Sequence, residues 1–248
     1  MLPRLLLLVC AINLMSLSAL AQIASVGHGV GGGALSRGSL AVAKGAHLAT
    51  ETVAVALPEA ATTLGGVTVT LDGVPCRIYA VSPEEIRFVV ADEIPYPRVE
   101  RRWPGWWYIY PQILRVSGPM TFEYRLNLTD TSPWWIRHDG ALFGVAVGEA
   151  GATTVFHGGK IPVIAGAKIQ LRGSGLRSFR PPEWVFYKVL LYDGENLLET
   201  EAEVFRDTLA PGVDIVQFAA PSEWKGKAGW LWLQTPSAFS DPAWATFE

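Results

Sequence analysis

The sequence predicts an all-β protein with two consecutive β-sandwich domains after a signal peptide. Glycine occurs 25 times and proline 17 times among the 248 residues. These turn formers separate short stretches in which apolar and polar side chains alternate, which is typical of strands. A hairpin signal lies at Asp72-Gly73, and a segment that begins at Gly38 recurs from Gly166. No stretch with a helical period extends beyond the first twenty residues.

Residues 1–21 have the pattern of a secretory signal peptide. Arg4 supplies a basic start, residues 5–17 an apolar run, and Ala19-Leu20-Ala21 the small-x-small cleavage pattern. The alternative is a retained membrane anchor, although the apolar run is short for a span of about 20 residues. We expect an exported chain, extracellular, at the cell surface or periplasmic, with no membrane span in its mature part. Residues 22–36, which are rich in glycine, are expected to form a flexible leader.

Charge and cysteine content narrow the function classes. Loss of Arg4 with the signal leaves 19 basic against 23 acidic residues, a net charge of −4. Nucleic-acid binding is not expected, because phosphate contacts require a clustered positive surface. Cys76 is the single thiol of the mature chain, so it has no intramolecular disulfide partner. The hairpin register predicts that this thiol is buried.

The hairpin at Asp72-Gly73 is the most complete local signal. Asp-Gly suits a two-residue type I′ turn, which needs a positive φ at both central positions. The turn predicts three cross-strand pairs facing the core: Leu71 with Val74, Val69 with Cys76, and Val67 with Ile78. A third strand completes this stretch, which extends from Thr63 to Ala91. A second hairpin is expected about Ser117-Gly118, between strands at residues 113–116 and 122–128.

An internal duplication divides the chain. Residues 38–48 read as a strand that ends in a glycine turn, and residues 166–176 are their counterpart 128 positions later. The matched residues are Gly38 with Gly166, Lys44 with Arg172, Gly45 with Gly173, Leu48 with Leu176, and Pro83 with Pro211. A period above one hundred residues indicates tandem domains rather than a solenoid. Alternation stops at residues 129–133, so the expected domains are residues 37–130 and 131–248.

In the second domain we expect strands within residues 134–147, 168–171, 186–192, 213–219 and 229–233. Short alternating strands of this kind suggest a sandwich in each half. Asp193-Gly194 is the analogue of Asp72-Gly73.

Several of these residues resemble a known family. They are Gly38-Ser39-Leu40, residues 61–69, Asp72-Gly73-Val74-Pro75, residues 79–83, Gly166 and Gly173-Ser174-Gly175-Leu176. They resemble a tandem immunoglobulin-like module, related to IPT/TIG domains, found at the C-terminal ends of large secreted proteins of soil bacteria.

The resemblance covers nearly all of the mature chain. Its most specific part is Leu-Gly-Gly-Val-x-Val-x-x-x-Gly-Val-Pro, from Leu64 to Pro75. It implies two immunoglobulin-like β-sandwiches and export, and no activity, because the family is of unknown function. The chain departs from the family at Glu85-Ile86-Arg87, where Gln-Ile-Asn is usual, and in an insertion over residues 98–110.

That insertion supplies the candidate binding residues. Its aromatic side chains and preceding arginines are Arg101, Arg102, Trp103, Trp106, Trp107, Tyr108 and Tyr110. One interpretation is a loop whose rings stack on a sugar or anchor a partner protein. The other is a strand over residues 106–110 whose rings cover the sandwich or the junction of the domains, since an exposed aromatic patch favours aggregation.

No stretch carries a catalytic signature. The four histidines form no pair or Cys/His cluster of the kind that binds zinc, so no metal or cofactor is expected. His138-Asp139, before Gly140, is interpreted as a turn rather than a catalytic pair, and Asp193-Gly194 as a turn rather than a calcium site. We expect a non-enzymatic interaction or spacer module at the cell surface, with an unknown protein or polysaccharide as partner. The alternative is a carbohydrate-binding module that uses residues 103–110.

Overall fold

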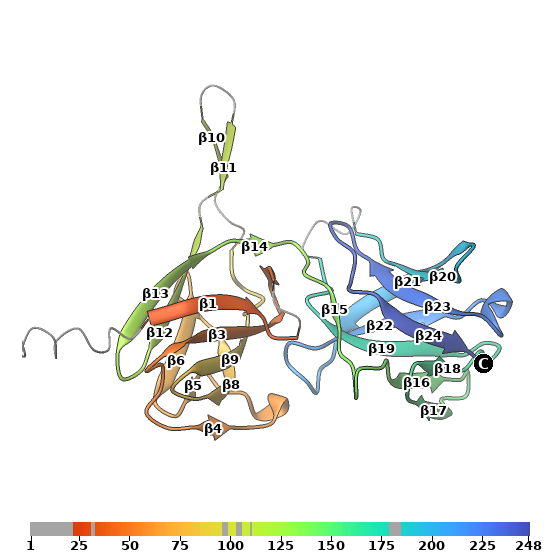
Figure 1. Ribbon diagram of the computed structural model, residues 1–248, viewed down its shortest axis with the longest axis horizontal. Coiled ribbons are helices and arrows are strands. Elements are labelled where there is room, and N and C mark those ends of the chain that lie inside the picture. Colours follow the sequence, from red (N-terminus) through yellow and green to blue (C-terminus); the bar gives the residue numbers. More distant parts are fainter. Residues whose placement is uncertain (1–21, 31–32, 96–98, 103–105, 110, 179–184) are drawn as a thin grey trace, which may run out of the picture.

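The computed structural model describes residues 22–30, 33–95, 99–102, 106–109, 111–178 and 185–248, and it confirms the all-β class. In these residues the regular structure is strands, with two single-turn 3-10 helices, η1 (Leu57–Glu59) and η3 (Ser222–Trp224). The predicted signal peptide lies outside the described residues. Figure 1 shows the strands in two groups that follow each other along the chain, joined near β14 (Leu128–Thr129).

The N-terminal group contains two five-stranded sheets. One has the order β1-β3-β9-β8-β4, and the other has β13-β12-β6-β5 with β7 beside β6. The strands of the first are β1 (Gln22–His28), β3 (Leu40–Ala46), β9 (Glu85–Val89), β8 (Arg77–Val81) and β4 (Val53–Ala54). Those of the second are β13 (Thr121–Leu126), β12 (Gln112–Ser117), β6 (Val67–Leu71), β5 (Thr63–Leu64) and β7 (Val74–Pro75).

In the C-terminal group the strands form one continuous ten-stranded sheet, with the order β17-β16-β19-β22-β21-β20-β23-β24-β18 and with β15 beside β19. They are β17 (Thr153–Phe156), β16 (Gly144–Val147), β19 (Lys168–Ser174), β22 (Asp214–Ala219), β21 (Leu197–Arg206), β20 (Lys188–Tyr192), β23 (Ala228–Gln234), β24 (Ala243–Phe247), β18 (Lys160–Ile161) and β15 (Trp134–Trp135).

The hairpin at Asp72-Gly73 forms as predicted, with one exception in its register. Both turn residues have positive φ, 49° and 81°, and Leu71 pairs with Val74. The Cys76 amide donates to the Val69 carbonyl at 2.9 Å, as the second predicted pair requires. The third pair is wrong. Val67 pairs with Leu64 instead, because the chain crosses to the other sheet after Cys76, where Ile78 pairs with Phe88 of β9.

The prediction of a flexible leader over residues 22–36 is also wrong. Residues 22–28 form β1, which pairs with β3 from Gln22 opposite Ala46 to His28 opposite Ala41. Ile23 is buried, so this strand contributes to the core although glycines surround it. β2 (Leu35–Ser36) then pairs in parallel with β14.

The same pairing order occurs in both groups of strands. β1-β3-β9-β8 in the first corresponds to β16-β19-β22-β21 in the second, and β6-β12-β13 corresponds to β20-β23-β24. The bounds of β3, residues 40–46, and of β19, residues 168–174, differ by the 128 positions that the sequence repeat indicates. In the second group the ten-residue strand β21 takes the place of both β7 and β8, which joins its two layers into one sheet.

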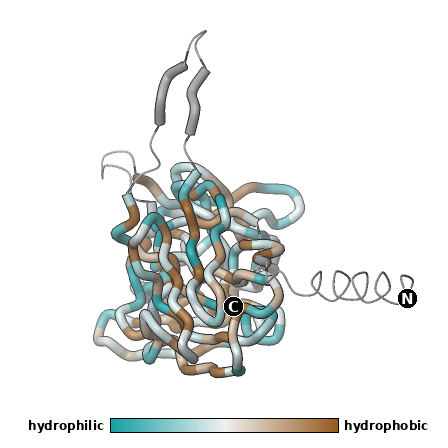
Figure 2. Tube along the Cα trace, turned by 90° about the vertical axis from the view of Figure 1, so that its left-hand side faces the viewer, coloured by the Kyte–Doolittle hydropathy of each residue, from teal (hydrophilic) through white to brown (hydrophobic). Residues whose placement is uncertain are grey.

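Two hydrophobic clusters underlie the two groups. The first draws its residues from Ile23 to Leu128 and the second from Trp135 to Phe247. In Figure 2 hydrophobic and hydrophilic stretches are interspersed along the chain. In β6 and β12 every second residue is buried, so one side of each strand faces the core. The break between the clusters includes the boundary that the sequence indicates at residues 129–133. That each range folds as an independent domain stays a prediction.

Candidate functional site at the junction of the two cores

The predicted binding residues that the structure describes lie on a separate two-stranded hairpin. β10 (Val99–Arg102) and β11 (Trp106–Ile109) pair only with each other among the described strands. The register sets Arg102 opposite Trp106, Arg101 opposite Trp107 and Glu100 opposite Tyr108. Trp103 and Tyr110 lie outside the described residues. Residues 106–109 thus form a strand, and the two interpretations of its aromatic residues stay open.

A buried ionic cluster lies between the two cores. Arg177, which follows β19, donates from Nε to an oxygen of Asp214, the first residue of β22. Its Nη2 donates to Oδ1 of Asp92, beyond β9 in the other core, at 3.2 Å. Arg206 pairs with the second oxygen of Asp92. Because these residues have no local motif and lie 85 and 37 positions apart, no sequence pattern pointed to them.

Because the cluster is buried, its ion pairs affect the free energy of unfolding more than surface pairs do. The side chains of Asp92, Arg177 and Asp214 are 15%, 17% and 1% exposed. Burial raises the pKa of Asp214, while the charge of Arg177 and the Leu176 amide, which donates to Oδ2 at 3.0 Å, act in the opposite direction. A buried carboxylate that loses its cation is strongly destabilising. The cluster therefore fixes the position of Asp92, and with it the end of β9, against the second core.

A pocket of about 480 Å³ opens beside the cluster, lined by residues of both halves that include Arg77, Asp92, Arg177, Arg206 and Asp207. Gly38 forms a tight part of its wall. Its φ is +66°, and a Cβ there would lie 2.4 Å from the Asp92 carboxylate and 2.5 Å from the Arg177 guanidinium. Only glycine fits this position without displacing the ion pair.

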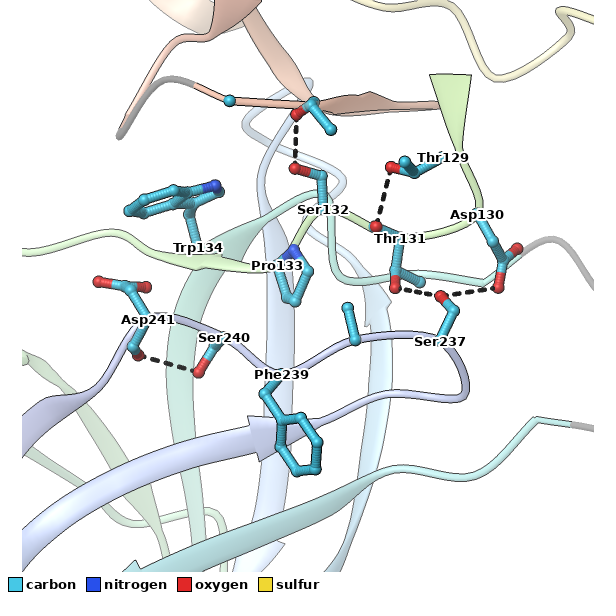
Figure 3. A pocket seen from close by; sticks show the side chains of 13 residues that line it. Thr129, Asp130, Thr131, Ser132, Pro133, Trp134, Ser237, Phe239, Ser240 and Asp241 are labelled. Atoms are coloured by element: carbon cyan, nitrogen blue, oxygen red, sulfur yellow. Dashed lines mark hydrogen bonds between the residues drawn. The ribbon is translucent and has the colours of Figure 1, made fainter. Parts of the chain in front are cut away.

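A second, larger pocket follows the linker between the cores. Its volume is about 660 Å³, and its lining residues come mainly from residues 129–134 and 237–241. Figure 3 shows the Ser237 hydroxyl between Thr131 and the Asp130 carboxylate. The Ser237 oxygen lies 2.7 Å from Thr131 Oγ1 and 3.3 Å from Asp130 Oδ2. These polar groups form hydrogen bonds with one another, and the bonds hold the linker against the loop that follows β23.

The other end of this pocket contains a second carboxylate. Trp134 and Asp241 lie together there, with Pro133 between them and Ser237 (Figure 3). Oδ1 of Asp241 accepts the Trp135 amide at 2.9 Å, and Oδ2 pairs with Arg137. Burial raises the pKa of Asp241, while the Trp135 amide and Arg137 act to lower it.

His28 adds a titratable group to the junction. Its ring stacks on Trp134 with centroids 6.0 Å apart, and its Nδ1 accepts the Val30 amide at 3.2 Å. Burial lowers the pKa of His28 to about 4, and the Ser174 backbone opposes this only in part. In the described part of the chain no group completes a well-formed hydrogen bond with Nε2. A charged imidazole is therefore disfavoured at this place.

The other motifs considered from the sequence form turns, as interpreted. His138 and Ala141 exchange backbone hydrogen bonds around Asp139 and Gly140, both at positive φ. Oδ1 of Asp193 accepts the amides of Glu195 and Asn196, at 3.0 and 2.8 Å. The Asn196 amide, the Lys227 ammonium and the Glu195 amide hold the pKa of Asp193 well below its usual range.

No model of a known protein family matches the chain, and no curated protein matches it either. Within the described residues, no three His, Cys, Asp or Glu side chains are grouped so that they could hold a metal ion. The same residues contain no helix of the length and apolar character needed to cross a membrane.

Proposed function

We propose that this chain is an exported, non-enzymatic interaction or spacer module of the bacterial cell surface, with two immunoglobulin-like sandwiches that act as one rigid support. The observation that carries the proposal is the Arg177 cluster, which joins Asp92 of one half to Asp214 of the other with all three side chains largely buried. A spacer must hold a fixed length and angle, and a buried ion pair has a narrow range of geometries because its hydrogen bonds are directional.

The backbone bonds at the junction support the same conclusion. The Leu40 amide donates to Ser174 Oγ at 2.9 Å, and the Ser132 amide donates to the Gly175 carbonyl at 2.9 Å. β2 pairs with β14, which holds the start of the linker to the first half. Inter-domain motion is the default where an interface is small and polar. Here hydrogen bonds from the linker and from both halves oppose such motion.

Export is part of the proposal and rests on the pattern of residues 1–21. The immunoglobulin-like assignment rests on the family resemblance and on the pairing order that occurs twice. Fractionation of cells that express the full chain tests the first: protein found only in the cytoplasm contradicts export.

Distance measurements between spin labels test rigidity. Cysteines placed by Thr121→Cys and Val155→Cys are exposed and lie in different halves. We expect one narrow distance distribution for the mature chain and a broad one after Arg177→Met. A broad distribution before that substitution contradicts the rigid support. Arg115→Met, which removes an exposed ion pair within one half, is the control.

Carbohydrate binding by the hairpin is the second candidate. The observation that favours it is the separate pairing of β10 and β11, with Arg101 and Arg102 set opposite Trp107 and Trp106. Arginine next to an aromatic residue suits an acidic polysaccharide, which offers carboxylates and apolar ring faces. Titration with alginate and polygalacturonate, before and after Trp103→Ala and Trp106→Ala, tests it. Absence of binding, or binding that both substitutions leave unchanged, rejects this candidate.

A further inference from the structure

An exposed row of large side chains crosses four neighbouring strands of the second half. Tyr192 of β20 pairs with Trp230 of β23, and Trp230 pairs with Trp244 of β24. Leu197 of β21 lies on the other side of Tyr192. Directly paired residues of antiparallel strands share a face. Figure 1 shows these four strands side by side.

This row faces solvent and not the core. The exposed fractions are 40% for Tyr192, 45% for Trp230, 54% for Trp244 and 61% for Leu197. Their sequence neighbours Leu191, Leu231 and Ala245 are buried. The rings are therefore on the outer face of the sheet.

The fold itself does not require an aromatic row here. β6, β12 and β13 of the first half correspond to β20, β23 and β24, and on their outer face one directly paired set is Thr70, Arg115 and Glu123. Arg115 donates to Glu123 from Nε at 3.1 Å and from Nη2 at 2.6 Å. The same architecture thus has an ordinary polar face in one half and exposed rings in the other. A contiguous exposed apolar patch of a few hundred Å² is often a binding surface.

The geometry of the two tryptophans suits a ring-shaped ligand. Their centroids are 5.4 Å apart and their planes meet at 86°, so one ring forms a floor and the other a wall. The C–H bonds on one face of a pyranose meet the negative face of an aromatic ring favourably. Both residues are exposed, and an exposed indole N–H can donate to a sugar hydroxyl.

The charges beside the row favour a neutral ligand. Lys188 pairs with Glu199 at 2.7 Å, and Lys227 pairs with Asp193 at 2.9 Å. Neither lysine therefore offers an uncompensated positive charge to an acidic polymer. The Tyr192 hydroxyl donates to the Gly194 carbonyl at 2.8 Å, which holds its ring in place.

The size of the row argues against a protein partner or a second copy. If each ring presents at most about 250 Å², the three aromatic residues leave roughly 350 Å² exposed. A stable protein interface needs about 800 Å² from each partner. One or two sugar residues need much less. We propose that Tyr192, Trp230 and Trp244 form a binding site for a neutral polysaccharide, independent of the junction and of the hairpin.

The affinity for one short chain is expected to be low. Stacking that covers about 60 Å² of a ring corresponds to roughly a tenfold change in affinity. Loss of either tryptophan should thus weaken binding about tenfold, and retention on a polymer would depend on many weak contacts.

Retention of the mature chain on insoluble cellulose, xylan, mannan and chitin tests the proposal, with soluble oligosaccharides of the retaining polymer used for titration. We expect binding to at least one polymer, weakened about tenfold by Trp230→Ala and by Trp244→Ala. Val155→Ala on β17 is the control, because it removes an equally exposed apolar side chain elsewhere. Thermal unfolding of each variant checks that the fold is intact, and Trp244→Phe, which keeps a ring, should restore part of the binding.

Four outcomes overturn the proposal. The first is that none of the four polymers retains the protein. The second is retention that both tryptophan substitutions leave unchanged. The third is a dimer in sedimentation experiments that Trp230→Ala dissociates, since a second copy then covers this face. Loss of binding only when residues 99–109 are replaced by a short turn would assign the sugar site to the hairpin instead.

Discussion

The backbone amide of Leu40 donates to the hydroxyl oxygen of Ser174 at 2.9 Å. Leu40 begins β3 and Ser174 ends β19, which are the matched strands of the internal repeat. The N-terminal end of one copy therefore meets the C-terminal end of the other, and both residues are buried there. The two copies of the repeat therefore contact each other directly, and are not connected through the linker alone.

Replacement of Arg177 should destabilise the protein far more than replacement of a surface arginine. Arg177→Met leaves Asp92 and Asp214 buried without their shared cation, which typically costs about 3–5 kcal/mol. Arg115→Met removes an exposed pair with Glu123 and should cost less than about 1 kcal/mol. Urea unfolding of both variants measures the difference. Equal losses would show that the junction cluster adds no more than a surface pair.

Two glycines provide a matched test of packing at the junction. Gly158 and Gly175 have similar positive φ, +66° and +70°, so alanine should be strained equally at both. At Gly158 a Cβ meets nothing within 4 Å, whereas at Gly175 it would lie 2.3 Å from the Ser132 carbonyl oxygen. We expect Gly158→Ala to cost about 1 kcal/mol. Gly175→Ala should cost clearly more, because the linker backbone has to move.

Thermal or urea unfolding measures both substitutions. Similar losses for the two variants would mean that the linker moves aside without cost, and this result would also argue against a rigid junction.

The parts of the fold that depend on local chemistry were predictable from the sequence. Asp72-Gly73 determines its turn through two positive φ values. β3 and β19 were predictable from the repeat in the amino-acid sequence. β1 was missed because glycines conceal a strand whose stability comes from pairing with β3. The false pair of Val67 with Ile78 arose because alternation continues through Cys76 while the chain changes sheets.

Neither candidate site could be assembled from the sequence. Asp92, Arg177 and Asp214 are brought together by the junction of two cores, which no periodicity encodes. Trp230 and Trp244 belong to alternating strands, but their pairing depends on a register that only the structure supplies. The aromatic residues within 103–110 were predicted as a binding loop because they are close together in the sequence.

Cys76 should not react with thiol reagents in the native protein. It is buried in the first core, and burial raises the pKa of its thiol to about 11, so little of the reactive thiolate exists at neutral pH. Labelling with a chromogenic disulfide should proceed only after denaturation. Rapid labelling of the native protein would show that the hairpin opens readily.

Stability should fall on mild acidification because of His28. An unfolded histidine has a pKa near 6.5, whereas burial lowers the pKa of His28 to about 4 in the folded chain. Between these values the unfolded state binds more protons, so the free energy of unfolding decreases as the pH falls through this window. The full stabilisation is present above pH 6.5. The decrease from 6.5 to about 4 corresponds to about 3 kcal/mol.

His28→Phe isolates this contribution, because phenylalanine can keep the stack on Trp134 but cannot be protonated. The variant loses the acceptor for the Val30 amide, so it should be less stable at pH 7. Its stability should nevertheless depend less steeply on pH between 6.5 and 4. Lys44, Glu85 and Arg87 line a pocket that includes His28, and they are present in both proteins, so the difference between the two slopes reports His28 alone. Equal slopes in urea unfolding across this window would mean that His28 is protonated without opening the junction, and that its burial against Trp134 contributes no pH dependence.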